Sequence, residues 1–105
     1  MASKVLNLLG IAAKAGKIKS GSFAAEEAIK NKSAVLLIMA EDASEGTKKQ
    51  FGNMSTFYEV EAISYSTKET LGRAIGKAER SCICVTDEGL AKAIKEQFAV
   101  RGGSK

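Results

Sequence analysis

The sequence predicts an α/β fold in which helices cover both faces of a small sheet. Segments with helical spacing of apolar residues alternate along the chain with short apolar runs such as SAVLLIMA and SCICV, and this alternation is typical of layered α/β domains. The length of 105 residues fits one domain, and a 45% share of hydrophobic residues can form a core without disulfide or metal cross-links. We therefore expect one domain over residues 1–100 and a solvated tail over 101–105.

The first 30 residues predict two helices joined by a loop. Apolar residues recur at helical spacing over Val5–Ala12, Ser3 can cap the helix start, and Gly16 follows as a stop signal. Residues 17–22 are expected to form a loop. The segment Phe23–Lys30 then returns to a helical pattern and predicts a second helix.

The middle of the chain predicts two strands separated by a third helix. The run SAVLLIMA (33–40) is almost wholly apolar, which favours a strand covered on both faces at the centre of the sheet. Ser44 can cap a helix that ends before Gly52. The segment FYEVEAIS (57–64) alternates large apolar and polar residues as a half-buried strand does, so we expect it nearer an edge.

The last third of the chain predicts a helix, a strand and a final helix. Ser66 and Glu69 have the spacing of a capping box at the start of a fourth helix over residues 66–78. The run SCICVTD (81–87) has the character of a second buried strand, and Asp87 can cap the final helix. The residues of that helix that we expect to face the core are Leu90, Ala91, Ile94 and Phe98.

Composition argues against most catalytic and metal-binding chemistry. The chain has no histidine and two cysteines, so the usual zinc sites and Cys/His or Ser/His nucleophiles cannot be assembled. We expect Cys82 and Cys84, one residue apart, to point to opposite faces of a strand and not to pair. No apolar run approaches the roughly 20 residues that span a bilayer. We therefore expect a cytoplasmic protein with no metal, cofactor, membrane anchor or small-molecule substrate.

The stretch GKIKSGSFAAEEAI (16–29) places cationic and hydroxyl side chains at a helix entrance. A helix start carries partial positive charge and unpaired N–H groups, so Lys17 and Lys19 beside Ser20 and Ser22 favour an anion such as phosphate. The alternative is that a serine caps the helix and the lysines only keep a turn soluble. The net charge of +4, concentrated among the first residues, favours an anionic polymer over a small acidic metabolite.

Three longer stretches resemble the ribosomal protein L7Ae superfamily, and within it the small bacterial YlxQ-like members. They read LNLLGIAAKAGKIKSG, VLLIMAEDASEGTKK and LGRAIGKAERSCICVTDEGLAKAI, and the resemblance spans almost the whole chain. It implies a three-layer α-β-α sandwich around a mixed sheet of about four strands. It also implies binding of kink-turn RNA, a sharply bent internal loop found in ribosomes and other ribonucleoproteins.

In this superfamily the turn into the second helix contacts RNA through a pattern of the form G-x-N-E-x-x-K. The resemblance places Gly21, Ser22 and Phe23 in this turn, and only the glycine matches the pattern. Phe23 and Ala24 replace the residues that hydrogen-bond bases, and Glu27 replaces the lysine. Phe23 either stacks on a flipped base or anchors the core, and the sequence leaves both readings open.

The second contact element that the resemblance implies is the loop GKAERS (76–81) before the last strand. Many relatives place branched apolar residues there, whereas this chain has Lys77 and Arg80, which suit phosphate contacts. The alternative is a solvated turn. We expect Lys17, Lys19 and the N–H groups of Gly21 and Ser22 to hold phosphates, with the loop closing over the other side.

These features predict an RNA-binding protein, not an enzyme, that docks on structured RNA of the ribosome or its assembly. The expected partners are ribosomal RNA or another kink-turn RNA, together with ribosomal proteins. The predicted RNA-binding residues are Lys17, Lys19, Gly21, Ser22, Phe23, Lys77 and Arg80. The alternative is a protein-interaction module that kept the fold and lost specific RNA recognition, which the substitutions at Phe23, Ala24 and Glu27 support.

Overall fold

Helices and strands alternate along the whole of the chain that the computed structural model describes, residues 3–103. The elements in order are α1 (Lys4–Lys14), β1 (Ile18–Ser20), α2 (Ser22–Lys30), β2 (Leu36–Met39), α3 (Glu45–Phe57), β3 (Ala62–Ser64), α4 (Lys68–Ala74), β4 (Cys82–Val85) and α5 (Glu88–Gly103). None of these helices combines the length and the apolar character needed to cross a membrane.

The four strands form one mixed sheet in the order β1-β4-β2-β3. β2 and β3 are parallel, with Ile38 opposite Ile63, whereas β4 runs antiparallel to both β1 and β2. The two central strands, β2 and β4, are buried along their full length. The predicted central place of the apolar run in β2 and the edge position of β3 are both confirmed.

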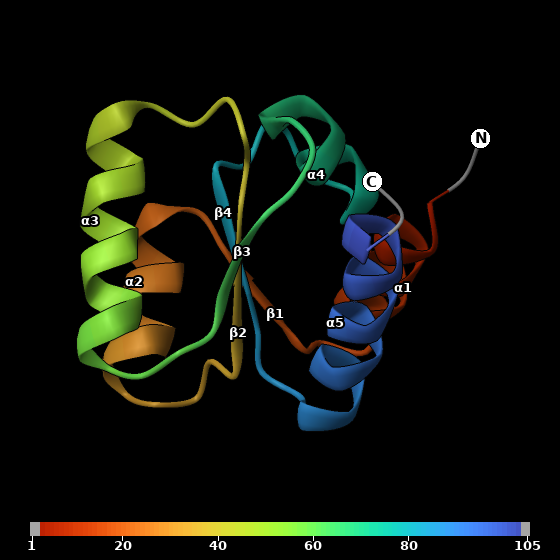
Figure 1. Ribbon diagram of the computed structural model, residues 1–105, viewed down its shortest axis with the longest axis horizontal. Helices are drawn as coiled ribbons and strands as arrows, with labels where there is room; N and C mark the ends of the chain where they lie inside the picture. Colours follow the sequence, from red (N-terminus) through yellow and green to blue (C-terminus); the bar gives the residue numbers. More distant parts are fainter. Residues whose placement is uncertain (1–2, 104–105) are drawn as a thin grey trace.

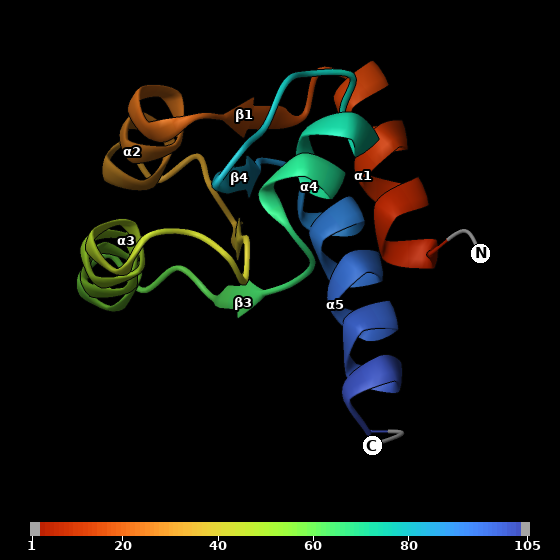
Figure 2. The same cartoon turned by 90° about the horizontal axis from the view of Figure 1, so that it is seen from above.

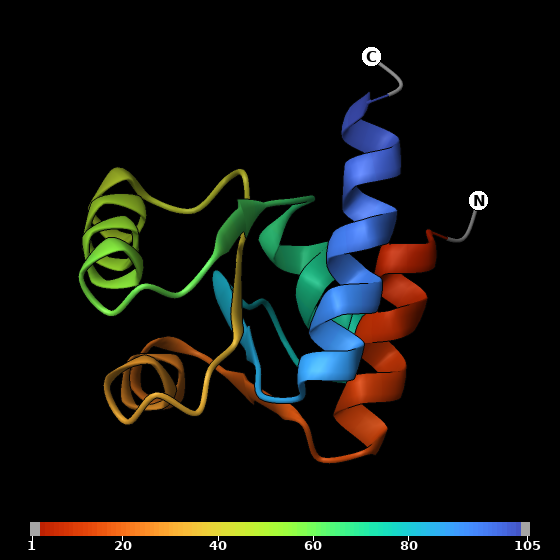
Figure 3. The ribbon, with the colours of Figure 1, turned by 60° about the horizontal axis from the view of Figure 1, so that its bottom comes forward.

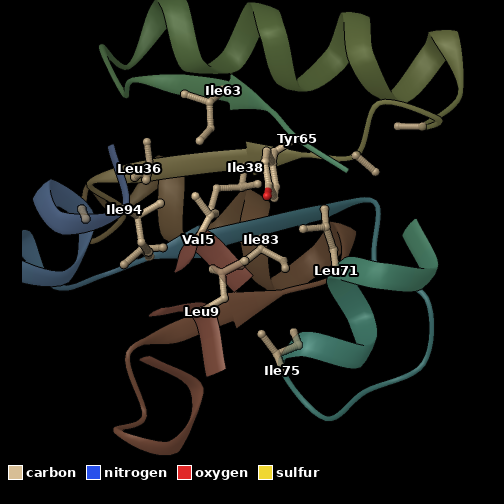
Figure 4. Packing of buried hydrophobic residues seen from close by; sticks show 14 residues of the cluster. Val5, Leu9, Leu36, Ile38, Ile63, Tyr65, Leu71, Ile75, Ile83 and Ile94 are labelled. Atoms are coloured by element: carbon tan, nitrogen blue, oxygen red, sulfur yellow. The ribbon is translucent and has the colours of Figure 1, made fainter. Parts of the chain in front are cut away.

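Helices cover both faces of the sheet, α2 and α3 on one side and α1, α4 and α5 on the other (Figures 1 and 3). Alternate strand residues point to opposite faces, so Ile38 and Ile83 pack against Val5 of α1, Leu71 of α4 and Ile94 of α5 (Figure 4). A second cluster lies under α2 and α3. The three-layer sandwich is therefore confirmed.

Three of the predicted helix caps are formed. The side-chain oxygens of Ser3, Ser44 and Asp87 accept hydrogen bonds from the backbone N–H groups three residues later. α5 packs its predicted apolar residues on the core, including Ile94, which is fully buried. Its backbone helix continues through Gly103, into the segment expected as a tail, and residues 104 and 105 lie outside the described part of the chain.

Two predicted boundaries in the middle of the chain are wrong. α3 does not end before Gly52 but continues to Phe57, so the expected strand over 57–64 is reduced to β3. The helix passes through the glycine because Phe51 and Ser55, on either side of it, form its buried face. Tertiary packing here outweighs the low helix propensity of glycine.

The expected capping box at Ser66 and Glu69 is also wrong. Ser66 has a left-handed backbone with φ of 61°, and the neighbouring Thr67 caps α4 by accepting from the N–H of Thr70. Glu69 instead pairs with the Arg73 guanidinium at 2.9 Å. α4 ends at Ala74, earlier than the predicted limit at residue 78.

Both cysteines are buried, free thiols on the same face of β4. The expectation that they point to opposite faces is wrong, because residues two apart in a strand share a face; the expectation that they do not pair is confirmed. The Cys84 thiol donates to the Ala25 carbonyl of α2 at 3.6 Å. Burial raises the pKa of Cys82 to about 11 and that of Cys84 to about 12.

Both thiols should therefore be unreactive while the protein is folded. With a pKa of about 11, roughly one Cys82 thiol in a thousand is ionised at pH 8, and the thiolate is the reactive form. We expect negligible labelling by a thiol-specific disulfide reagent in native buffer and two thiols labelled per chain in guanidinium chloride. Rapid labelling of the native protein would contradict the burial of β4.

Candidate nucleic-acid interface

Four connecting segments meet at the end of the molecule where β4 begins. The N–H of Gly21 donates to the Cys82 carbonyl at 3.1 Å, and the N–H of Ala40 donates to the Ser81 carbonyl at 2.9 Å. The N–H of Arg80 donates to the Lys68 carbonyl at 3.0 Å. We call this surface, formed by residues 20–23, 40–44, 66–68 and 76–82, the β4-entry end; it lies at the top in Figure 1.

Gly21 gives α2 an open N-terminus at the β4-entry end. Its φ of 90° and ψ of 160° lie in a region that is essentially restricted to glycine, and as the N-cap it has no side chain to accept from the first helical turn. The N–H groups of Phe23 and Ala24 therefore lack the acceptor that a serine or aspartate cap supplies, and the Ser22 N–H, the first of the helix, has no intrahelical partner. The predicted phosphate contact by the Gly21 N–H is wrong, because Cys82 occupies that donor.

Phe23 is exposed over 76% of its surface in the first turn of α2. The buried side of this helix is formed instead by Ala25, Ala28 and Ile29. The reading of Phe23 as a core anchor is therefore wrong. An aromatic ring in solvent beside open N–H groups can stack on a planar ligand without disturbing the core.

Arg80 is held in place by two hydrogen bonds. Its Nε donates to the Ser20 hydroxyl at 3.2 Å, and its Nη1 donates to the Glu79 carbonyl at 2.9 Å. An arginine has five N–H groups, so Nη2 and one N–H of Nη1 are left for a ligand. Ser20 is a site residue that is missing from the predicted RNA-binding residues. Its role depends on β1, and the sequence predicts a loop over this segment.

The predicted crowding of lysines at the start of α2 is wrong. Residues 18–20 form a strand, so Lys17 lies at the far end of β1, where its carbonyl accepts from the Thr86 N–H. The three residues of β1 separate it from Gly21, so the two Cα atoms lie four residue steps apart, about 13 Å at 3.3 Å per residue. Lys19 lies between them, exposed and opposite Cys84 in the sheet.

The loop after α4 folds tightly back on the helix and leaves Lys77 exposed. The Lys77 N–H donates to the Gly72 carbonyl at 2.8 Å, and a side chain at Gly72 would collide with the Ala78 carbonyl oxygen. Gly76 has a φ of 74°, which turns the chain away from α4. Lys77 is thereby placed on the side of the loop that faces α1.

The β4-entry end carries three acidic residues (Glu41, Asp42 and Glu79) and three basic ones (Lys68, Lys77 and Arg80), so an anion would be held there by N–H donors and the guanidinium and not by net charge. Asp42 is committed to the fold, because its Oδ1 accepts from the Lys68 N–H at 2.8 Å, and Glu26 pairs with Lys30 at 2.8 Å. Glu27 is exposed on α2. Among residues 3–103 no cluster of three or more metal-ligating side chains is found.

Comparisons with known proteins agree with this architecture. Residues 3–95 match the model of the ribosomal protein L7Ae/L30e/S12e/Gadd45 family. The chain is 37% identical to the RNA-binding protein YlxQ of Enterococcus faecium over 89% of each chain. It is also 37% identical to the protein of that name from Bacillus subtilis, over 83% of this chain and 87% of the relative.

Two solved structures share the fold over most of their length. A protein of unknown function from Bacillus halodurans is 33% identical, with a TM-score of 0.90 over 93% of this chain and 99% of that one. A 15.5 kDa RNA-binding protein from Giardia lamblia is 20% identical, with a TM-score of 0.75 over 94% of this chain and 88% of the other. At that identity, the second likeness bears on the fold alone.

The exposure of Phe23 predicts that its removal leaves the fold intact. We expect Phe23→Ala to change the free energy of unfolding by no more than about 0.5 kcal/mol, as surface substitutions do. Phe51→Ala, which empties a fully buried position, should cost about 3–5 kcal/mol. Chemical denaturation of the two variants measures the contrast, and a similar loss in both would show that Phe23 packs in the core.

Proposed function

Because the chain belongs to the ribosomal protein L7Ae/L30e/S12e/Gadd45 family, we propose that it binds structured RNA at the β4-entry end. The observation that carries this proposal is the pair of contacts that joins the start of α2 to the loop before β4. The Gly21 N–H donates a hydrogen bond to the Cys82 carbonyl, and the Arg80 Nε donates one to the Ser20 hydroxyl. They bring an open helix N-terminus, an exposed ring and a tethered guanidinium to one surface.

Each of these groups has a role on RNA. The N–H groups of Ser22 and Phe23 lie at the positive end of α2 and can bind a phosphate oxygen. Arg80 presents its remaining N–H groups to a second phosphate, a geometry in which arginine binds bidentately. Phe23 stacks on an unpaired base, an interaction that tolerates any base because each has a π face. Lys19 and Lys77 add charge on either side.

We propose that the RNA is a kink-turn or a similarly bent RNA of the ribosome or its assembly, and that the protein acts in the cytoplasm without catalysis. The relatives named RNA-binding proteins support the RNA. The substitutions at Phe23 and Ala24 weaken base readout, because neither side chain can hydrogen-bond a base edge, and Glu27 repels the phosphate backbone where the superfamily pattern has a lysine. Stacking and phosphate contacts then supply most of the affinity.

A protein-interaction module is the second candidate, and one observation favours it. Phe57 is exposed over 77% of its surface at the end of α3, and its ring contacts Tyr58 edge to face with centroids 4.9 Å apart. α3 packs on the sheet mainly through the buried side chain of Phe51. Its outer side is therefore available to a partner, on a helix that the proposed RNA site does not use.

Binding to a synthetic kink-turn RNA should weaken steadily as salt is raised. With a handful of phosphates neutralised, the logarithm of the affinity should fall with a slope of about −0.9 per duplex phosphate. Arg80→Gln should cost about 1.5–3 kcal/mol, as expected for loss of a charge-assisted contact. Lys17→Gln removes the same charge at the far end of β1 and is the matched control.

Fluorescence anisotropy at several salt concentrations measures both effects. A flat salt dependence would contradict an electrostatic dock. Equal losses in Arg80→Gln and Lys17→Gln would show that only net charge matters and that the β4-entry end is not the site.

A second test restores the superfamily pattern at α2 with Phe23→Asn, Ala24→Glu and Glu27→Lys. Because Phe23 and Glu27 are exposed and Ala24 is half-buried, the triple variant should fold, which a thermal melt verifies. Each restored bidentate base contact should add on the order of 1–3 kcal/mol to kink-turn affinity, with little gain on a plain duplex. A folded triple variant without this gain would favour the protein-interaction module.

A further inference from the structure

A groove lies beside Arg80, between the C-terminal halves of α1 and α4. Its volume is about 640 Å³, and its lining includes Lys14, Ser20, Arg73 and Lys77. In Figure 2 the chain that leaves α4 passes beside the end of α1 and then crosses β1 in this view on its way to β4. We call this hollow the α1–α4 groove.

Small residues and close helix packing shape the floor of the groove. Gly10 of α1 faces the end of α4, and a Cβ added to it would lie 3.2 Å from the Ala74 carbonyl oxygen. Ala13 and Ala74 also line the groove. The short side chains leave the backbones of both helices near the surface, while the long cationic side chains rise at the rim.

The rim of the groove is positively charged. Lys14, Arg73 and Lys77 are all exposed. Arg73 pairs with Glu69 at 2.9 Å, but both side chains are more than two-thirds exposed, so water screens the pair. No ion pair is found for Lys14 or Lys77 within the described part of the chain. No acidic side chain lines the groove itself.

Both helices end at the groove, so their C-terminal dipoles place partial negative charge there. Lys14 and Arg73 lie in the last turns of α1 and α4 and offset these dipoles. Lys77 lies beyond the end of α4, outside the last helical turn, so its positive charge is not cancelled by a helix dipole. The net charge along the rim, with the helix dipoles included, therefore remains positive and attracts an anion.

The groove is continuous with the β4-entry end. The Ser20 hydroxyl lines the groove and accepts from the Arg80 Nε at 3.2 Å. Lys77 lies three residues before Arg80 in the same loop and lines the groove as well. A chain of phosphates bound by Arg80 can therefore continue past Ser20 to Lys77 and Lys14.

We infer that the α1–α4 groove binds the phosphodiester backbone of the RNA stem that leaves the β4-entry end. This inference rests on the proposed function and extends its footprint to the other face of the sheet. The contacts are to phosphates, so they add affinity without reading sequence. Charge complementarity and the shared Ser20–Arg80 contact favour RNA as the occupant.

The test compares two synthetic kink-turn RNAs that differ only in the length of one stem, the longer extended by about one helical turn. The wild-type protein should bind the longer RNA more tightly and with a steeper salt dependence. Lys14→Gln combined with Arg73→Gln should abolish this difference, lowering the salt slope on the longer RNA by about one per cation removed. Affinity for the shorter RNA should not change.

Lys48→Gln combined with Lys49→Gln is the matched control, because it removes two charges from α3 on the opposite face of the sheet. The single variant Lys14→Gln leaves the Glu69–Arg73 pair intact and should give about half of the slope change. This single variant replaces the double variant in the test if the double variant loses thermal stability.

The outcomes separate this inference from the proposed function. If the groove variants bind both RNAs as the wild type does, the groove inference is overturned and the proposed function stands. If the wild type binds neither RNA better than a plain duplex of equal length, both are overturned. Loss of affinity for the longer RNA alone, absent in the α3 control, supports the groove.

Discussion

The hydrogen bond from the Gly21 N–H to the Cys82 carbonyl is the constraint on which the candidate site depends. It extends the antiparallel β1–β4 ladder by one residue and, with the φ of 90° at Gly21, turns the chain directly from β1 into α2. The start of α2 is thereby fixed beside the residues that precede β4. Because β4 is buried along its full length, the anchor of this junction is one of the most protected parts of the fold.

The site is therefore assembled from segments about 60 residues apart by a rigid scaffold rather than by a flexible loop. A side-chain hydrogen bond between Arg80 and Ser20 joins the same two segments, and Asp42 fixes the neighbouring turn by accepting from the Lys68 N–H at the start of α4. The surface that results combines an open helix end, an exposed aromatic ring and a held guanidinium. Such a surface suits backbone binding and stacking more than base readout, and the α1–α4 groove lengthens its electrostatic footprint.

Much of the fold could be predicted because its signals are local. Ser3, Ser44 and Asp87 cap helices through contacts three residues away, and the apolar runs in β2 and β4 indicate strands that are covered on both faces. β1 could not be predicted in this way, since Ile18–Ser20 is a strand only because β4 lies beside it. Because the local sequence does not indicate β1, it places Lys17 too close to α2. For the same reason Ser20 belongs to the anion-favouring stretch but not to the predicted RNA-binding residues. The exposure of Phe23 depends on which side of α2 meets the sheet, a matter of tertiary packing.

We propose that RNA contacts the junction of β1, α2 and β4. The most direct measurement is a titration of ¹⁵N-labelled protein with kink-turn RNA, followed by the backbone amide signals and the Arg80 side-chain Nε–H signal. We expect the largest changes at Ser22, Phe23 and Arg80, with little change along α3. Changes confined to α3 around Phe57, with an unperturbed junction, would contradict it.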